Sequence, residues 1–201
     1  MTADRLAPFK GKSGKSAETS PFKAGSDTLY PLYQKEVLLM SETPRIIQNA
    51  FNTPVPPPKT RVSCRGIVIR DGKLLLSYES KKDVYMSPGG GLEDGETSEE
   101  CCVREIAEET GYTTKVISPI VIIDEYFDDT LFVSEYFLCQ VVGQGESSLT
   151  STEIDHGMMP RWVPLDEAVE IFSHYPEKTP DHHSLYLREY TLLTKYILKT
   201  E

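Results

Sequence analysis

From residue 61 onward, apolar and polar positions alternate in runs that are typical of β-strands. The stretch RVSCRGIVIRDGKLLLSYES, residues 61–80, contains two such runs on either side of Asp71 and Gly72. An Asp-Gly pair supplies the positive φ angles of a tight turn, so the pattern predicts a hairpin. Three further β-rich stretches lie at residues 112–127, 130–143 and 160–165, the first two joined by a turn at Asp128-Asp129.

Helical periodicity predicts three helices between and after these strands. The first is expected to begin at Thr97, which forms a capping box with Glu100, and to end at Gly111, where a left-handed cap is favoured. The second lies around residues 166–172, and the third covers residues 184–198. The third helix repeats apolar side chains on one stripe, at Tyr186, Tyr190, Leu193 and Ile197. Because strands and helices alternate irregularly, we expect an α/β fold in which helices cover both faces of a mixed sheet.

The first 60 residues differ in composition from the rest. Residues 1–29 are rich in Lys, Ser, Gly and Pro and show no apolar periodicity, which indicates disorder. A short apolar patch, LYPLYQKEVLLM, follows, and the prolines of NTPVPPPK at 52–59 require an extended linker. The expected organisation is a disordered or extended N-terminal segment over residues 1–60 and one domain over residues 61–201.

The net charge of -10 argues against general affinity for nucleic acid or anionic membranes, because both attract basic surfaces. No apolar run approaches the roughly 18 residues of a membrane span, and the N-terminus lacks a signal-peptide core. A cytoplasmic location is therefore expected. The four cysteines lack zinc-like spacing and are expected to be reduced and packed, at Cys64, Cys101, Cys102 and Cys139.

Eight carboxylates and one arginine crowd the stretch GGLEDGETSEECCVREIAEETGY, residues 90–112. On the predicted helix, Glu105, Glu108 and Glu109 are spaced i, i+3 and i+4, so they share one face. Like charges at this spacing repel, and clustered oxygen ligands suit Mg²⁺ or Mn²⁺ rather than zinc. A merely solvated acidic face is the alternative. The preceding glycines favour a ligand site, because they let the backbone approach a ligand closely.

The same stretch carries a specific motif. Its fixed positions are Gly90, Glu96, Arg104, Glu105, Glu108, Glu109 and Gly111, with apolar Ile106 and Tyr112. In type and spacing it resembles the complete Nudix box, with no departure at a defining position. The resemblance implies an α/β/α sandwich with a mixed sheet. It also implies hydrolysis of the pyrophosphate linkage in a nucleoside diphosphate joined to another group.

The resemblance implies roles for the residues of the box. The expected catalytic residues and Mg²⁺ ligands are Glu105, Glu108 and Glu109, helped by a backbone carbonyl of Gly89 or Gly90, with Mn²⁺ as an alternative metal. Glu96 and Arg104 are expected to form a structural ion pair that locks loop against helix.

The general base is open, since in some family members it resembles Glu105 and in others it comes from a downstream loop. The loop before Trp162 offers Glu153 and Asp155, although both also suit ordinary surface positions. Arg65 is a candidate phosphate contact, although a strand arginine is more often a surface charge. The candidates for stacking on a base are Tyr126, Phe127 and Phe132, although aromatic residues in strands are usually core.

Three functional interpretations follow. The first is a Nudix hydrolase that acts on a small-molecule nucleotide such as a nucleotide sugar, an ADP-ribose-like compound or a nucleoside triphosphate; a homodimer is compatible with it. The second is a non-catalytic nucleotide-binding module that regulates a partner. The third is diphosphate isomerisation in isoprenoid synthesis, which the same fold supports and which requires a catalytic cysteine, Cys64 or Cys139.

Overall fold

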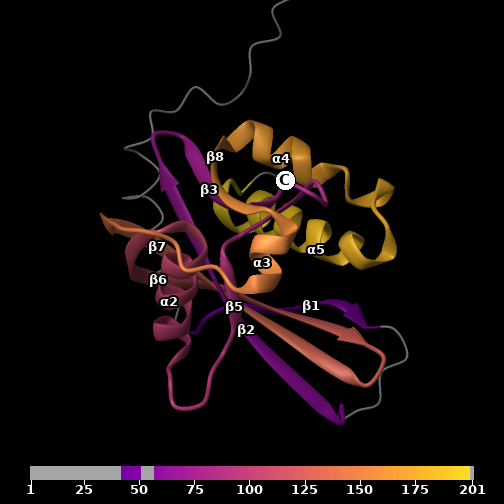
Figure 1. The fold of residues 1–201 in the computed structure, drawn as a ribbon. Helices are drawn as coiled ribbons and strands as arrows, with labels where there is room; N and C mark the ends of the chain where they lie inside the picture. The colour runs from indigo at the N-terminus through magenta and orange to yellow at the C-terminus, as the bar shows by residue number, and fades with distance from the viewer. Residues whose placement is uncertain (1–41, 51–56, 200–201) are drawn as a thin grey trace, which may run out of the picture.

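Eight strands form the centre of the protein in the computed structural model, which describes residues 42–50 and 57–199 (Figure 1). Their order is β1-β6-β7-β2-β3-β4, with β5 beside β2 and β8 beside β3. The strands are β1 (Arg45–Ala50), β2 (Lys59–Arg70), β3 (Lys73–Glu79), β4 (Val84–Met86), β5 (Gly89–Gly91), β6 (Tyr112–Phe127), β7 (Thr130–Gln144) and β8 (Met158–Pro164).

The sheet is mixed, as expected. β1 runs parallel to β6 and β2 runs parallel to β7, whereas the other neighbouring strands are antiparallel. The predicted hairpin is present, with φ of 52° at Asp71 and 71° at Gly72. Its strands pair only next to the turn and then separate. β2 continues beside β5 and β7, and β3 continues beside β4 and β8.

Helices cover both faces of this sheet, which confirms the predicted sandwich (Figure 1). On one face lies α2 (Ser98–Thr110), and on the other lie α4 (Leu165–Ser173) and α5 (Pro180–Thr191). The remaining elements are α3 (Ser151–His156), η1 (Tyr175–Glu177) and η2 (Leu192–Ile197). The capping box of α2 is present at Thr97 and Glu100, and Gly111 ends the helix at φ 73°.

The C-terminal helix differs from its prediction at both ends. It begins at Pro180, because a proline fits the first helical position, and from Leu192 it continues as the π-helical turn η2. There the amide of Leu198 donates to the carbonyl of Leu193, five residues back. Tyr186, Leu193 and Ile197 are buried as expected.

Two clusters of apolar side chains form the core. The larger packs α4, α5 and η2 on the sheet through residues such as Phe172, Tyr186 and Leu192. The smaller lies beneath α2 and includes Ile106 together with the four cysteines, all of which are buried. The cysteines are thus packed thiols, as the sequence predicts.

The expected boundary near residue 61 does not coincide with the edge of the sheet. β1, within the predicted N-terminal segment, pairs with β6, and the amide of Ile122 donates to the carbonyl of Pro44. Ile46 and Ile47 favour a strand, and an edge strand gains hydrogen bonds from the existing sheet, which the composition of residues 1–60 did not reveal. Residues 1–29, for which the sequence predicts disorder, lie outside the described residues, as do the apolar patch and most of the proline-rich stretch. Within residues 42–50 and 57–199, none of the helices combines the length and apolar character that crossing a bilayer requires.

Candidate active site

Glu109 is the most enclosed of the three candidate metal ligands on α2, with 4% of its surface exposed. The hydroxyl of Ser77, on β3, donates to its carboxylate at 2.5 Å, and the amide of Gly89 donates at 3.3 Å. Burial raises the pKa of Glu109 to about 7, despite the opposing effects of Ser77 and Arg65. The site therefore holds a carboxylate whose negative charge is poorly compensated.

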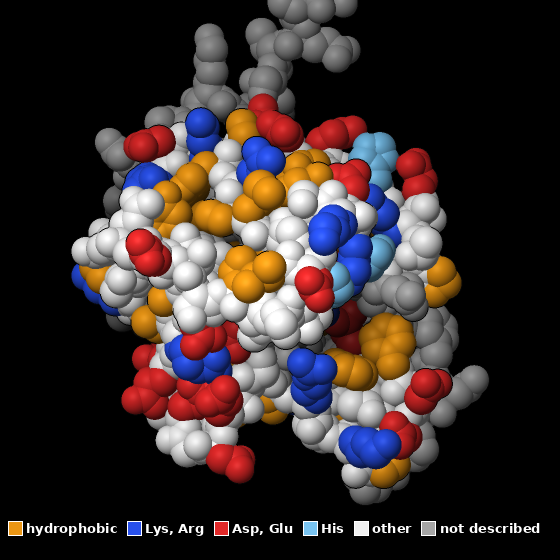
Figure 2. All heavy atoms as spheres, viewed as in Figure 1, with side chains coloured by type: hydrophobic (Ala, Val, Ile, Leu, Met, Phe, Trp, Pro, Cys, Tyr) orange, Lys and Arg blue, Asp and Glu red, His pale blue; other side chains and the backbone are white. Residues whose placement is uncertain are grey.

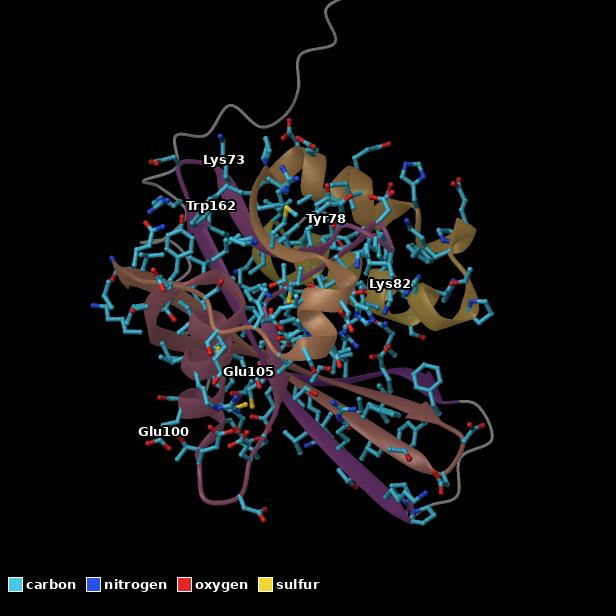
Figure 3. The ribbon with its side chains drawn as sticks, in the orientation of Figure 1. Lys73, Tyr78, Lys82, Glu100, Glu105 and Trp162 are labelled. Atoms are coloured by element: carbon cyan, nitrogen blue, oxygen red, sulfur yellow. The ribbon has the colours of Figure 1, made fainter. Side chains whose placement is uncertain are left out.

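Glu105 lies one helical turn earlier and faces the glycines of β5 (Figure 3). A Cβ atom on Gly90 would come within 2.5 Å of the Glu105 carboxyl atoms, so only a glycine fits here without displacing them. Burial raises the pKa of Glu105, and Glu108 and Glu153 raise it further, whereas Arg104 lowers it. These carboxylates are close enough to repel one another.

Arg104 is the positive charge within this acidic group. Its guanidinium forms two contacts with Glu96, at 2.7 and 3.1 Å, and one with the carbonyl of Gly91. It also reaches Glu105 at 2.8 Å and Glu108 at 3.2 Å. The hydrogen bonds from Arg104 hold the pKa of Glu96 down at about 2. Arg104 thus ties the loop before α2 to the helix and screens two of the candidate ligands.

The donor chemistry fits a hard divalent cation, because the facing side chains offer carboxylate oxygens beside a glycine strand. Figure 2 shows acidic side chains gathered over α2. As the carboxylates are oriented, no three potential metal ligands converge within the described part of the chain. Arg104 donates hydrogen bonds to both Glu105 and Glu108, and these bonds help to hold the two carboxylates in their present orientation.

Glu153 and Asp155 belong to the short helix α3 and not to a loop. Thr150 and Glu153 form a capping box and Gly157 caps the other end at φ 69°, a signature that is visible in the sequence but was not recognised there. Glu153 is half-buried and close enough to raise the pKa of both Glu105 and Glu109, whereas Asp155 is exposed. The structure therefore brings Glu153, rather than Asp155, toward the carboxylates.

β3 and α2 hold α3 in place from its two sides. His156, the last residue of α3, contacts Glu79 of β3 at 3.0 Å, and Lys82 contacts the same carboxylate at 3.3 Å. On the other side, α2 holds the segment that leads into α3, since the amide of Ser148 donates to the carbonyl of Glu108. Ser77 and Glu79 are two residues apart, so their side chains lie on the same face of β3. One strand therefore positions both Glu109 and α3.

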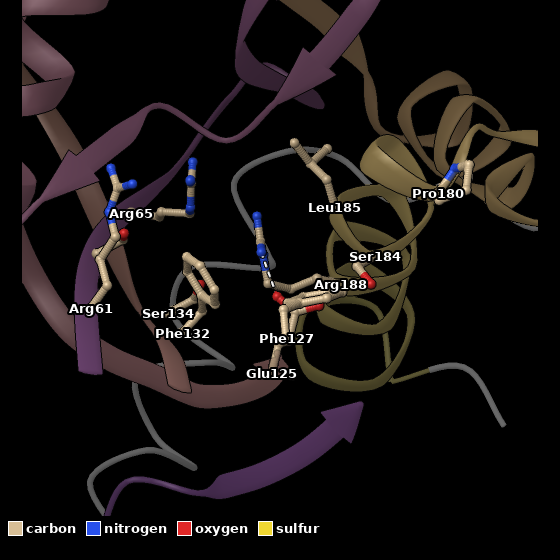
Figure 4. Close-up of a pocket in the computed structure, with 11 residues that line it drawn as sticks. Arg61, Arg65, Glu125, Phe127, Phe132, Ser134, Pro180, Ser184, Leu185 and Arg188 are labelled. Carbon is tan, nitrogen blue, oxygen red and sulfur yellow. Dashed lines mark hydrogen bonds and ion pairs between the residues drawn. The ribbon is translucent and has the colours of Figure 1, made fainter. Parts of the chain in front are cut away.

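On the opposite face of the sheet, a pocket of about 520 Å³ lies between β2, β6, β7 and α5 (Figure 4). From β2 it is lined by Arg61, Ser63 and Arg65, which alternate to one face of the strand. The other strands contribute Glu125, Phe127, Phe132 and Ser134, and α5 contributes Pro180, Ser184, Leu185 and Arg188. Phe127 and Phe132 therefore line the pocket, whereas Tyr126 is absent from its lining.

A buried polar network forms the wall beneath α5. Arg188 contacts Glu125 at 2.6 Å and donates to the Tyr136 hydroxyl at 2.7 Å. Tyr136 donates to Glu189 at 2.9 Å, and Ser87 donates to the other oxygen of Glu189 at 2.5 Å. Ser87 precedes β5 by two residues, so the network links the pocket wall to the glycine strand beside α2.

Arg65 is a candidate from the sequence, whereas most other residues of the pocket and of the polar network are not. The polar side chains of Arg61, Ser63 and Arg65 alternate with apolar ones, a signal that this face of β2 is not simply core. Ser77 and Arg188 gave no comparable signal, because their partners are 32 and 63 residues away in the chain. Burial raises the pKa of the Cys64 thiol, which does not favour the isomerase interpretation.

Comparison with known proteins agrees with this geometry. The NUDIX domain family matches residues 60–187, and the chain belongs to this family. The chain is similar to an ADP-ribose pyrophosphatase of Methanocaldococcus jannaschii, with 47% identity over 60 residues, 28% of this chain and 36% of that protein. It is also similar to the putative ADP-ribose pyrophosphatase YjhB of Bacillus subtilis, with 37% identity over 69 residues, 34% of this chain and 33% of that protein.

The aligned regions thus span about a third of the length of these two curated relatives. A solved NUDIX hydrolase from Nitrosomonas europaea superposes with a TM-score of 0.51 at 24% identity, over 71% of this chain and 96% of that one. This similarity shows the Nudix fold.

Proposed function

We propose that this NUDIX protein is a metal-dependent hydrolase that cleaves the pyrophosphate linkage of a nucleoside diphosphate joined to another group. The observation that carries the proposal is the complete box around α2, with buried Glu109 and half-buried Glu105, the latter set against the glycines of β5. Two relatives are named ADP-ribose pyrophosphatase, which makes ADP-ribose the first substrate to test.

Glu105, Glu108 and Glu109 would hold the metal ion, with Mg²⁺ expected and Mn²⁺ as an alternative. When bound, the ion would offset the charge of the phosphate oxygens and make a coordinated water more acidic. Family members generally use divalent metal ions. The overall charge of -10 repels a pyrophosphate, so the site needs local positive charge of this kind.

The residues of the chain would divide the remaining work. Ser77 and the amide of Gly89 hold the Glu109 carboxylate in place, and Arg104 anchors the loop to α2. In the reaction, the water oxygen forms a bond to one phosphorus, the bridging P–O bond breaks, and the released phosphate keeps that electron pair. The proton of the water would pass to a carboxylate, either Glu105 or Glu153, both on the same side of the sheet.

The test is a substrate panel with Mg²⁺, comprising ADP-ribose, nucleotide sugars, dinucleoside polyphosphates and nucleoside triphosphates, with release of mononucleotide or phosphate as the readout. Hydrolysis of at least one compound, dependent on a divalent ion, is the expected result. A folded protein that hydrolyses none of them contradicts the proposal. Tight nucleotide binding without turnover, unchanged by Glu108→Gln, would instead indicate the regulatory module.

A further inference from the structure

The pocket and the candidate active site lie on opposite faces of the sheet, and they approach each other where Arg65 of β2 pairs with Gly89. In the register of the sheet, Arg61 lies beside Phe132, Ser63 beside Ser134, and Arg65 beside Tyr136. Arg65 is also the partner of Gly89 across β5. Successive rows are two residues apart, so Arg61 and Arg65 are separated by about 13 Å along the strand. One end of the pocket therefore reaches the glycine strand next to Glu109, and the other end lies at the turn between β6 and β7.

The end near the glycine strand suits an anion. One Arg65 nitrogen donates to the carbonyls of Ser87 and Gly89, at 3.0 and 3.4 Å. The Arg65 Nε atom is buried and has no hydrogen-bond partner within the described residues. A buried donor without a partner is unfavourable, and an oxygen atom of a bound ligand would satisfy it. Phosphate oxygens suit a guanidinium in both charge and geometry.

The middle and far rows suit a sugar and an aromatic base. Ser63 and Ser134 present hydroxyl groups side by side, which match the hydroxyls of a ribose. Beyond them, the rings of Phe127 and Phe132 meet edge to face, with centroids 5.9 Å apart, and Phe127 is 39% exposed. Arg61 is the register partner of Phe132 in this row, and a guanidinium can lie over an aromatic ring.

We propose that this pocket holds the nucleoside monophosphate half of the substrate, with the phosphate at Arg65, the ribose at Ser63 and Ser134, and the base against Phe127 and Phe132. This inference rests on the proposed function and adds the orientation of the substrate in the site. The scissile linkage lies at the Arg65 end, beside Glu109, and the second group of the substrate extends toward α3. The mononucleotide is the product that stays in the pocket, so it competes with substrate.

The experiment measures binding by calorimetry to the full chain, in the absence of metal. The probes are the four nucleoside 5′-monophosphates, the corresponding nucleosides, ribose 5-phosphate and inorganic phosphate. We expect at least one monophosphate to bind at least tenfold more tightly than its nucleoside and than ribose 5-phosphate. If inorganic phosphate binds as tightly as every mononucleotide, the pocket is an anion site and the proposal is wrong.

Two variants separate the ends of the pocket. Arg65→Gln is expected to weaken the mononucleotide and ribose 5-phosphate at least tenfold while changing nucleoside binding little. Phe132→Leu is expected to weaken the mononucleotide and the nucleoside but not ribose 5-phosphate. Arg70→Gln is the matched control, because Arg70 is on the same strand but its guanidinium lies 4.5 Å from the centre of the Trp162 ring. Equal affinities in all three folded variants would overturn the assignment.

A measurement on the unaltered chain covers the case in which a variant does not fold. An azido-substituted mononucleotide, photolysed and mapped by mass spectrometry, should label the segment from Glu125 to Ser134 or α5. Labelling confined to other segments contradicts the proposal. Hydrolysis is measured in parallel. Mononucleotide binding without hydrolysis would support the pocket assignment and contradict the proposed function. Hydrolysis combined with a mononucleotide affinity that does not change in the Arg65 and Phe132 variants would support the proposed function and contradict the pocket assignment.

Discussion

Two buried glutamates on opposite faces of the sheet differ in how the protein compensates their charge. Glu125, on the α5 side, is 1% exposed and contacts the Arg188 guanidinium at 2.6 Å. Glu109, on the α2 side, is 4% exposed, and within the described residues no ion pair joins it to a basic side chain. Its partners are the Ser77 hydroxyl and the Gly89 amide.

The difference separates a carboxylate that belongs to the architecture from one that is available to a ligand. The pair between Glu125 and Arg188 is complete within the chain, and breaking it exposes the cost of burying a lone charge. Glu109 carries that cost in the native state, which its raised pKa of about 7 reflects. A site that tolerates such a charge is a candidate for binding a cation.

The largest effect is expected from breaking the internal pair. Arg188→Met leaves Glu125 buried without its cation and should lower the free energy of unfolding by about 3–5 kcal/mol. Urea denaturation followed by circular dichroism measures this loss. The double variant with Glu125→Gln should recover part of it, because no uncompensated charge remains. A single variant as stable as the parent would show that water already screens Glu125.

Glu109→Gln should produce the opposite outcome, a loss of rate with little loss of stability. Removing a poorly compensated buried charge does not weaken the fold, whereas hydrolysis should slow by about a hundredfold or more, the order of a lost acid–base or ligand group. The measurements are kcat with Mg²⁺ and the thermal midpoint. Glu99→Gln, an exposed position on the same helix, is the control. An unfolded Glu109 variant would assign this residue to structure instead.

A methyl group beside Glu105 tests the site more gently. In Gly90→Ala the new Cβ meets the Glu105 carboxyl group at 2.5 Å, so this flexible side chain must move. We expect Mn²⁺ affinity, measured by calorimetry, to fall by about tenfold, a change typical of disturbed metal-ligand geometry. Gly91→Ala is the matched control, because nothing lies within 4 Å of its Cβ position. Equal affinities in the two variants would exclude Glu105 from the metal site.

The smallest effect concerns the ion pair at the surface. The pKa of Glu96 is lowered to about 2 in the folded protein, below its value of about 4.3 in an unfolded chain. Its stabilising contribution is therefore present above about pH 4.3 and is lost as the pH falls toward 2. Thermal midpoints of Glu96→Gln and the parent should differ more at pH 7 than at pH 3. A difference independent of pH would mean that the charge of Glu96 contributes nothing.

Local signals predicted most of the fold. The turn at Asp71-Gly72 and both ends of α2 depend on interactions within a few residues, and the structure confirms them. β1 could not be assigned in this way, since its pairing with β6 joins residues more than 70 positions apart. The separation of β2 from β3 likewise depends on competition between distant strands. A single sequence does not show which of the possible strand pairings is the most stable.

The residues of the candidate site likewise differ in whether a local sequence signal could predict them. The box could be recognised because its glutamates follow one another on a single helix. Ser77 and Glu189 could not, because their partners, Glu109 and Ser87, are distant in the sequence and are reached only after the chain has folded. Glu153 was noticed for its position before Trp162, but its placement near Glu109 depends on α3 docking against Glu79.

The four buried thiols beneath α2 allow local opening around this helix to be measured in the unaltered protein. Cys101 and Cys102 have 0% exposure. Burial raises the pKa of Cys101, and the contact with Cys139 together with burial raises that of Cys102, so a small alkylating reagent finds no thiolate in the closed state. We therefore expect alkylation to require an opening motion that exposes these side chains. The rate of alkylation therefore reflects how often this region opens. A slower rate with a bound nucleotide would show that the ligand stabilises the closed position of the helix that carries the box.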